Sequence, residues 1–79
     1  MVMTDKEGTL RMRSSGRWAI VRPGREPVEI TSGELFRVEV LGEEGLQLTR
    51  MEHLYAEGYY SADGYELRDG MRAAIGETG

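Results

Sequence analysis

Short stretches in which every second residue is apolar recur along the chain, and glycine-containing turns separate them. The clearest stretch is ELFRVEV (34–40), in which Phe36, Val38 and Val40 share one face of an extended chain. Because side chains alternate between the two faces of a strand, this spacing predicts β-strands rather than helices. RWAIVR (17–22) carries apolar residues in both phases, which predicts a strand covered on both faces for part of its length.

Turn residues mark where these strands end. The Pro-Gly pair at 23–24 is typical of a type II turn, because proline fixes φ at the second position and glycine accepts positive φ at the third. Two Asp-Gly pairs, at 63–64 and 69–70, have the composition of tight hairpin turns. We therefore expect YELR (65–68) to be a short strand between two hairpin turns.

The segment that begins with LQLTRM does not keep one phase. Met51 falls out of phase with Leu46 and Leu48. An extra residue near positions 49–50 would return the apolar side to the core, which predicts a β-bulge. A short helical turn over RMEHLYAEG (50–58) is the alternative.

The pattern as a whole predicts an all-β fold. About six or seven short strands with glycine at most corners fit a small SH3-like barrel or a tight antiparallel meander. Trp18 and Phe36 are isolated within strands, so we expect them in the core. We predict a flexible N-terminal segment over 1–7, a single small β domain over 8–76 and a C-terminal tail over 77–79.

A chain of 79 residues without cysteine has few means of stabilising its fold. It has room for one domain with a small core and cannot use disulfides or thiolate zinc sites. Its apolar side chains must suffice, or a partner chain must complete the core. A homodimer is therefore one expectation, with adaptable apolar residues at the interface: Met3, Met12, Met51 and Met71.

The composition is that of a soluble protein, with 39% hydrophobic and 30% charged residues. The first residues show no secretory signal, and no stretch approaches the roughly 20 apolar residues of a membrane span. We expect a cytoplasmic protein without membrane contact.

Charge is distributed unevenly. Residues 1–37 hold seven basic and five acidic residues, a balance of +2, whereas residues 38–79 hold three basic and nine acidic residues, a balance of −6. The net charge of −4 disfavours direct nucleic-acid binding, because such binding depends on cations that replace counterions on phosphate.

The residues needed for catalysis or metal binding are scarce. The single histidine, His53, could join Glu52 or Glu57 at a metal, but adjacent strand residues such as Glu52 and His53 point to opposite faces. No nucleophile elbow accompanies the serines, which all lie beside turns. We therefore expect neither an enzyme nor a metal or cofactor site. The serines considered as nucleophiles with His53 are Ser14, Ser15, Ser32 and Ser61.

Four tyrosines fall within eleven residues of the acidic half. Tyr59 and Tyr60 are adjacent in a predicted strand, so at least one should be exposed unless a second layer covers it. Exposed tyrosine among carboxylates resembles a protein-contact surface, and a tyrosine-rich core with its hydroxyls at the rim is the alternative. The predicted partner-binding residues are Glu52, Tyr55, Glu57, Tyr59, Tyr60, Asp63 and Tyr65.

Four segments carry a resemblance to a known family: SGRWAI, ITSGELFRVEV, LTRMEH and GYYSADGYELRDGMRAAIG. Across residues 16–76 the chain resembles a bacterial domain-of-unknown-function family of short all-β proteins associated with plasmids, phages and other mobile elements. The resemblance rests on glycine corners and apolar positions. It implies a compact β domain and supplies no reaction, ligand or catalytic residue.

Two functional hypotheses follow. In the first, the chain is a non-catalytic interaction module that docks its acidic, tyrosine-rich half on a basic, nucleic-acid-handling partner. With the mobile-element resemblance, this module would be a phage- or plasmid-encoded inhibitor of the anti-CRISPR type. The alternative is a small barrel that binds nucleic acid through N-terminal arginines: Arg11, Arg13, Arg17, Arg22 and Arg25.

Overall fold

Seven short strands form within residues 6–76, as the alternating pattern predicts. The computed structural model describes residues 6–76, and no helix occurs within this range. The prediction of an all-β fold with six or seven short strands is confirmed. The strands are β1 (Glu7–Met12), β2 (Trp18–Val21), β3 (Val28–Glu29), β4 (Leu35–Glu39), β5 (Leu46–Leu54), β6 (Gly58–Ser61) and β7 (Arg72–Ile75).

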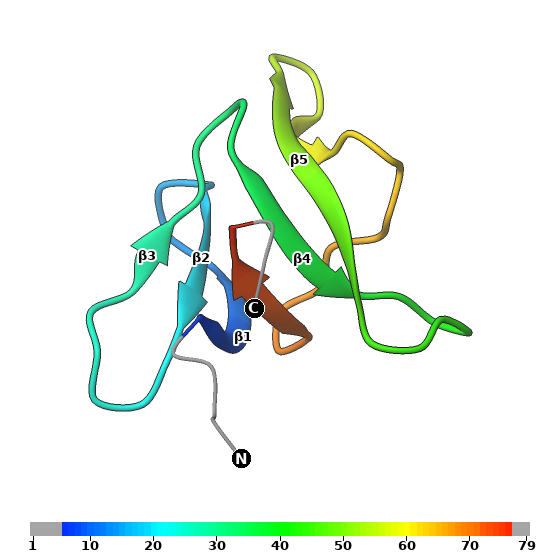
Figure 1. Ribbon diagram of the computed structural model, residues 1–79. Coiled ribbons are helices and arrows are strands. Elements are labelled where there is room, and N and C mark those ends of the chain that lie inside the picture. Colours follow the sequence, from blue (N-terminus) through cyan, green and yellow to red (C-terminus); the bar gives the residue numbers. More distant parts are fainter. Residues whose placement is uncertain (1–5, 77–79) are drawn as a thin grey trace.

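All seven strands belong to one antiparallel sheet with the order β3-β2-β1-β7-β4-β5-β6. Two three-stranded meanders, β1 to β3 and β4 to β6, flank the C-terminal strand β7. The register places Ala74 opposite both Glu7 of β1 and Arg37 of β4. The sheet curls into a half-barrel, with β7 at its centre and β3 and β6 as its edges (Figure 1).

The concave face of the sheet holds the core. Phe36 and Val38 are fully buried, as the alternation in ELFRVEV predicts, and Trp18 is 7% exposed. The strand β2 is buried in both phases, because Ala19 and Ile20 are also inaccessible to solvent. The buried cluster consists of Leu10, Trp18, Ile20, Ile30, Phe36, Val38, Met51, Met71 and Ala73.

The turn at 23–24 forms as its sequence predicts. Gly24 has a φ of 70°, and the Arg25 N–H donates to the Arg22 carbonyl oxygen over 3.2 Å. Positive φ at the third position is the signature of a type II turn.

The predicted strand at YELR is wrong. Residues 64–68 form no strand, and the two Asp-Gly pairs are not the turns of a hairpin. The physical reason lies in the topology: β7 occupies the slot between β1 and β4, so the chain must cross from the edge strand β6 to the centre. The connection over 62–71 packs Tyr65 and Leu67 against the core on its way, and the Gly70 N–H donates to the Leu10 carbonyl oxygen over 2.7 Å.

The predicted phase of β5 is also wrong. Leu48 is 45% exposed, whereas Thr49 and Met51 point inward and are buried. The strand is continuous over Leu46–Leu54, so the alternative of a helical turn is wrong as well. The strand reaches Met51 without a bulge, because Thr49 and Met51 both point inward. The Thr49 hydroxyl forms a hydrogen bond with the Ser61 hydroxyl inside the fold.

The boundaries of the sheet differ slightly from the prediction. The strand β1 begins at Glu7, one residue before the expected start of the domain. The predicted flexible segment over 1–7 lies largely outside the described residues, as do Met3 and the predicted tail over 77–79. Of the methionines considered for a dimer interface, Met51 and Met71 are buried in the core and Met12 is exposed.

Candidate docking surface

Ion pairs cover the convex face of the sheet around β1, β2 and β7. Arg72 of β7 contacts Glu7 of β1 over 2.6 Å, and Arg13 contacts Glu29 of β3 over 3.4 Å. Arg11 contacts Asp69 over 3.2 Å. The charged groups on this part of the convex face are thus largely engaged within the molecule.

The convex face of β4, β5 and β6 is different, because large apolar side chains remain exposed there. In strand alternation, Leu48 and Leu54 of β5 point outward, beside Leu35 of β4 and Tyr60 of β6, and each is between 36% and 48% exposed. Clustered apolar side chains on a surface are typical of interaction sites. We call this surface the β4–β6 outer face; it comprises Leu35, Leu48, Arg50, Glu52, Leu54 and Tyr60.

The turn between β5 and β6 extends this surface. Tyr55 is completely exposed at its tip, and Glu57 is exposed beside it. Among residues 6–76 seven large apolar side chains are exposed, and five of them belong to this turn or to the β4–β6 outer face. The exposed apolar area is therefore concentrated at one end of the sheet.

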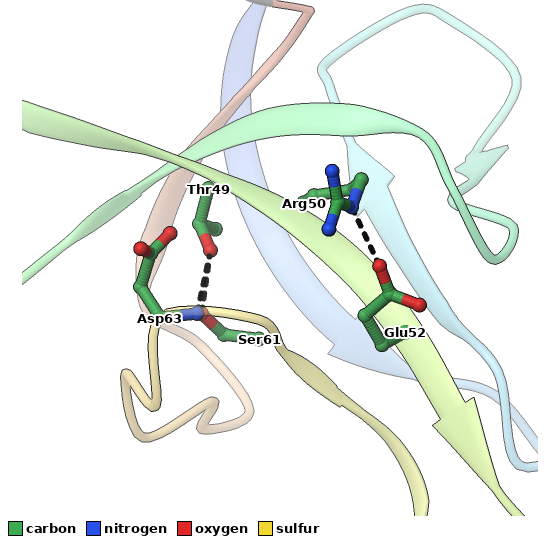
Figure 2. Close-up of polar contacts among 5 residues, drawn as sticks. All are labelled: Thr49, Arg50, Glu52, Ser61 and Asp63. Atoms are coloured by element: carbon green, nitrogen blue, oxygen red, sulfur yellow. Dashed lines mark hydrogen bonds and ion pairs between the residues drawn. The ribbon is translucent and has the colours of Figure 1, made fainter.

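A buried pair of hydroxyls fixes the far end of β6 against β5. The Thr49 and Ser61 hydroxyls lie 2.7 Å apart, and the Asp63 N–H donates to both oxygens over 3.4 and 3.3 Å (Figure 2). This contact positions Asp63, whose carboxylate is exposed. On the opposite face of β5, the Arg50 guanidinium donates to the Glu52 carboxylate (Figure 2).

A groove of about 320 Å³ lies at one end of this surface, between β4, β5 and the residues that follow β6. Leu35 and Leu48 form apolar walls, and Arg50 and Asp63 supply one charge of each sign. Such a groove can take up an amphipathic side chain whose stem packs on the leucines and whose polar end reaches the rim.

The structure separates the predicted partner-binding residues into two sets. Tyr59 and Tyr65 are half-buried and pack against the core. The Tyr59 ring lies 4.5 Å from the His53 ring between centroids, and the Arg17 guanidinium lies 5.7 Å from the Tyr59 centroid. The other five lie on the outer face, on the turn or at the end of β6: Glu52, Tyr55, Glu57, Tyr60 and Asp63.

The leucines of this surface escape the sequence prediction. The shared phase of Leu46 and Leu48 predicts both side chains on the core side. Leu35 lies on the other face of its strand from Phe36, and nothing else in the sequence marks it. If Thr49 and Met51 are taken as the inward residues of the strand, Leu48 falls on the exposed face, as observed. The sequence does not suggest this choice, because threonine is polar and inward positions are usually apolar.

Tyr65 contributes to a second groove instead. This groove of about 440 Å³ lies between the end of β4 and the 62–71 connection, with Glu39 and Glu66 among its lining residues. Leu41 at its edge is almost fully exposed. Its apolar lining consists of Val40, Leu41 and Tyr65, of which Val40 and Tyr65 are half-buried.

Within residues 6–76, the ring contacts of the single histidine are with tyrosines. His53 makes ring contacts with Tyr55 and Tyr59 and has no hydrogen bond to a serine or a carboxylate in this range. The described residues also hold no group of three or more histidine, aspartate or glutamate side chains placed to bind a metal. Over the same range, no helix long and apolar enough to cross a membrane is present.

Comparison with known proteins gives no assignment, because no family model, no curated protein and no solved structure matches the chain. The resemblance to a mobile-element-associated family therefore stays a prediction.

Proposed function

We propose that the protein is a non-catalytic interaction module that docks the β4–β6 outer face and the adjacent turn on a basic surface of a partner protein. The observation that carries this proposal is the gathering of exposed apolar side chains beside carboxylates that have no ion-pair partner within residues 6–76. Leu48, Leu54 and Tyr60 supply apolar contact area, while Glu57 and Asp63 supply negative charge at the margin.

The apolar and the charged side chains of this surface would play different parts in binding. Aromatic and aliphatic side chains at the centre of a contact provide most of the binding energy, and charges at the rim steer association and select the partner. The partner we propose handles nucleic acid in the cytoplasm, since its phosphate-binding cations would suit these carboxylates. An inhibitor encoded by a mobile element is the more specific form of this proposal.

Nucleic-acid binding by the chain itself has less support. Of the N-terminal arginines, Arg11 and Arg13 share the convex face but are each paired with a carboxylate. A phosphate would have to displace Asp69 from Arg11 and Glu29 from Arg13.

Affinity capture from host lysate with paired variants tests the proposal. The variant Leu48→Ser/Tyr60→Ser removes apolar contact area from exposed positions, so it should keep its fold and lose the captured partner. The variant Glu57→Gln/Asp63→Asn should weaken capture, and the wild-type complex should weaken as salt rises.

The variant Glu43→Gln/Glu44→Gln is the matched control. It removes the same charge from the exposed loop at the opposite end of β5, so it should capture the partner as the wild type does. The proposal is contradicted if every protein captured by the wild-type chain is also captured by the Leu48→Ser/Tyr60→Ser variant, or if the wild type captures none.

A further inference from the structure

The two edges of the sheet are protected to different degrees. The edge strand β3 is only two residues long, follows Pro27 and carries Glu29. The edge strand β6 spans Gly58–Ser61 and contains neither a charge nor a proline. Short length, proline and charge are the usual means of preventing edge pairing, and β6 lacks the last two.

The hydrogen-bond pattern shows which backbone groups of β6 face outward. The Ala62 N–H donates to the Arg50 carbonyl oxygen over 2.8 Å, so residues 50 and 62 are a hydrogen-bonded pair. Antiparallel pairs alternate, which makes Tyr59 and Ser61 the residues whose N–H and C=O groups point away from β5. The Ser61 carbonyl oxygen accepts the Gly64 N–H over 2.9 Å, and the other three groups have no backbone partner within residues 6–76.

A carboxylate stands beside each end of this open edge. Glu57 directly precedes β6 and Asp63 follows it by two residues; both are exposed, and neither forms an ion pair within residues 6–76. Glu57 belongs to the turn before β6, and Asp63 belongs to the turn that the hydrogen bond from the Gly64 N–H to the Ser61 carbonyl oxygen closes. The edge therefore offers backbone groups in its middle and negative charge at both ends.

A second copy of the chain fits this edge poorly. Two-fold pairing centred on Tyr60 would place Tyr59 opposite Ser61 of the other copy. It would also bring the turn that holds Glu57 next to the turn that holds Asp63 of the other copy, at both ends of the paired strands. Like charges that face each other across paired strands are destabilising, and two such pairs would oppose this dimer. A strand with cationic residues at both ends would instead attract the carboxylates of Glu57 and Asp63.

We propose that β6 accepts an extended segment of the partner protein as an eighth, antiparallel strand. The segment would carry lysine or arginine beside Asp63 and again, six residues later, beside Glu57, with uncharged β-forming residues between them. This mode is strand addition at a sheet edge, in which main-chain hydrogen bonds give affinity and flanking side chains give selectivity. The inference rests on the proposed function and specifies the chemistry of the partner.

A heptapeptide with the sequence KTVTVTK, acetylated and amidated, is the probe. Its two lysines are six residues apart, and in the proposed register its two valines lie opposite Ser61 and Tyr59. We expect NMR to show binding to the full chain, with slower hydrogen exchange at the Tyr59 and Ser61 amides. Since these two amides point away from β5 in the free protein, protection there reports the added strand directly.

Two control peptides separate charge from backbone pairing. The peptide with both valines N-methylated keeps the charges but cannot donate the valine hydrogen bonds, so we expect at least about tenfold weaker binding. The peptide ETVTVTE keeps the backbone and reverses the charges, so it should not bind detectably.

Protein variants provide the reciprocal test. The variant Glu57→Gln/Asp63→Asn should weaken binding of KTVTVTK about five- to tenfold, as expected for the loss of two exposed ion pairs. The variant Glu43→Gln/Glu44→Gln should bind the peptide as the wild type does.

Three results would overturn the inference: equal binding of the N-methylated peptide, unprotected Tyr59 and Ser61 amides in the peptide complex, or no binding of KTVTVTK at millimolar concentration. A dimer in light scattering whose Tyr59 and Ser61 amides are protected without peptide would also do so, because the edge would then belong to a second copy. Each of these results leaves the proposed function to be judged separately by capture, because the Leu48→Ser change in that test lies on β5 and not on the edge strand.

Discussion

The Thr49 and Ser61 hydroxyls form a buried hydrogen bond of 2.7 Å between β5 and β6. Both residues are at most 2% exposed, and they lie on the concave side of the sheet with Met51. A polar residue inside a core is tolerated when its hydrogen-bonding groups are satisfied. This pair therefore allows threonine to occupy an inward position and leaves Leu48 on the surface.

Removal of either hydroxyl should lower the free energy of unfolding by more than half of the loss caused by removing both. We expect Thr49→Val or Ser61→Ala to lower the free energy of unfolding by about 1 to 3 kcal/mol, because the remaining hydroxyl loses its side-chain partner. The double variant should lose less than the sum of the two. Urea unfolding followed by the fluorescence of Trp18, the only tryptophan, measures each value. Strict additivity of the two losses would contradict the account.

Gly8 of β1 lies against the end of β2. A Cβ atom there would overlap the carbonyl oxygen of Val21 and lie 2.7 Å from the Arg22 Cγ. Because backbone must move to make room, Gly8→Ala should destabilise the protein by about 3 kcal/mol. Gly45→Ala is the control: Gly45 has positive φ but open space around it, so we expect a loss of only about 1 kcal/mol. Thermal or urea unfolding compares them, and equal losses would show that steric overlap at Gly8 is unimportant.

Asp69 links the 62–71 connection to β1, and its pKa records the contact. The Met12 N–H, which donates to the carboxylate over 2.7 Å, and the Arg11 guanidinium hold the pKa of Asp69 below its ordinary value. A carboxyl with a lowered pKa stabilises the folded state above its unfolded-state pKa of about 3.9. This contribution is lost as pH falls through the lower, folded-state pKa.

We therefore expect Asp69→Asn to be less stable than wild type at neutral pH, with a difference that disappears in acid. Carboxyl NMR titration should show the lowered pKa of Asp69 directly. In Arg11→Gln this pKa should rise only part of the way, because the Met12 N–H is the larger cause of the shift. A full return to the ordinary value would assign the shift to Arg11 instead.

Arg37 is a position where substitution should not harm stability. Its side chain points outward from β4 between Leu48 and Ala74 in register, yet its Nε and Nη2 are shielded from solvent without a hydrogen-bond partner in the described part of the chain. Replacement of unsatisfied polar groups by an apolar side chain of similar length is neutral or stabilising. We expect Arg37→Met to leave the free energy of unfolding unchanged or to raise it by about 1 kcal/mol, as measured in urea. A loss above about 1 kcal/mol would reveal a role for the guanidinium.

Alternation and turn chemistry predict most of the fold. Phe36 and Val38 identify β4, and the two apolar phases around Ile20 identify a strand covered on both faces. The sequence fails where long-range topology decides. YELR has the local pattern of a strand, but the position of β7 between β1 and β4 turns it into a crossing connection. No local signal contains that information.

The candidate surface is predictable only in part. Alternation indicates correctly that one of Tyr59 and Tyr60 is exposed, and the hairpin turn exposes Tyr55. Tyr65 lies against the core because its segment is not the predicted hairpin strand. The exposure of Leu48 depends on the phase of β5, which the buried Thr49 conceals.

Cross-linking from single positions tests most directly which face binds a partner. The chain has no cysteine, so Ala56→Cys beside Tyr55 or Glu26→Cys in the β2–β3 connection each provides one attachment point for a photo-activated cross-linker. The account predicts that, in a complex with its captured partner, a linker at position 56 cross-links to the partner and a linker at position 26 does not. Cross-linking at position 26 with none at position 56 would contradict the assignment of the docking surface.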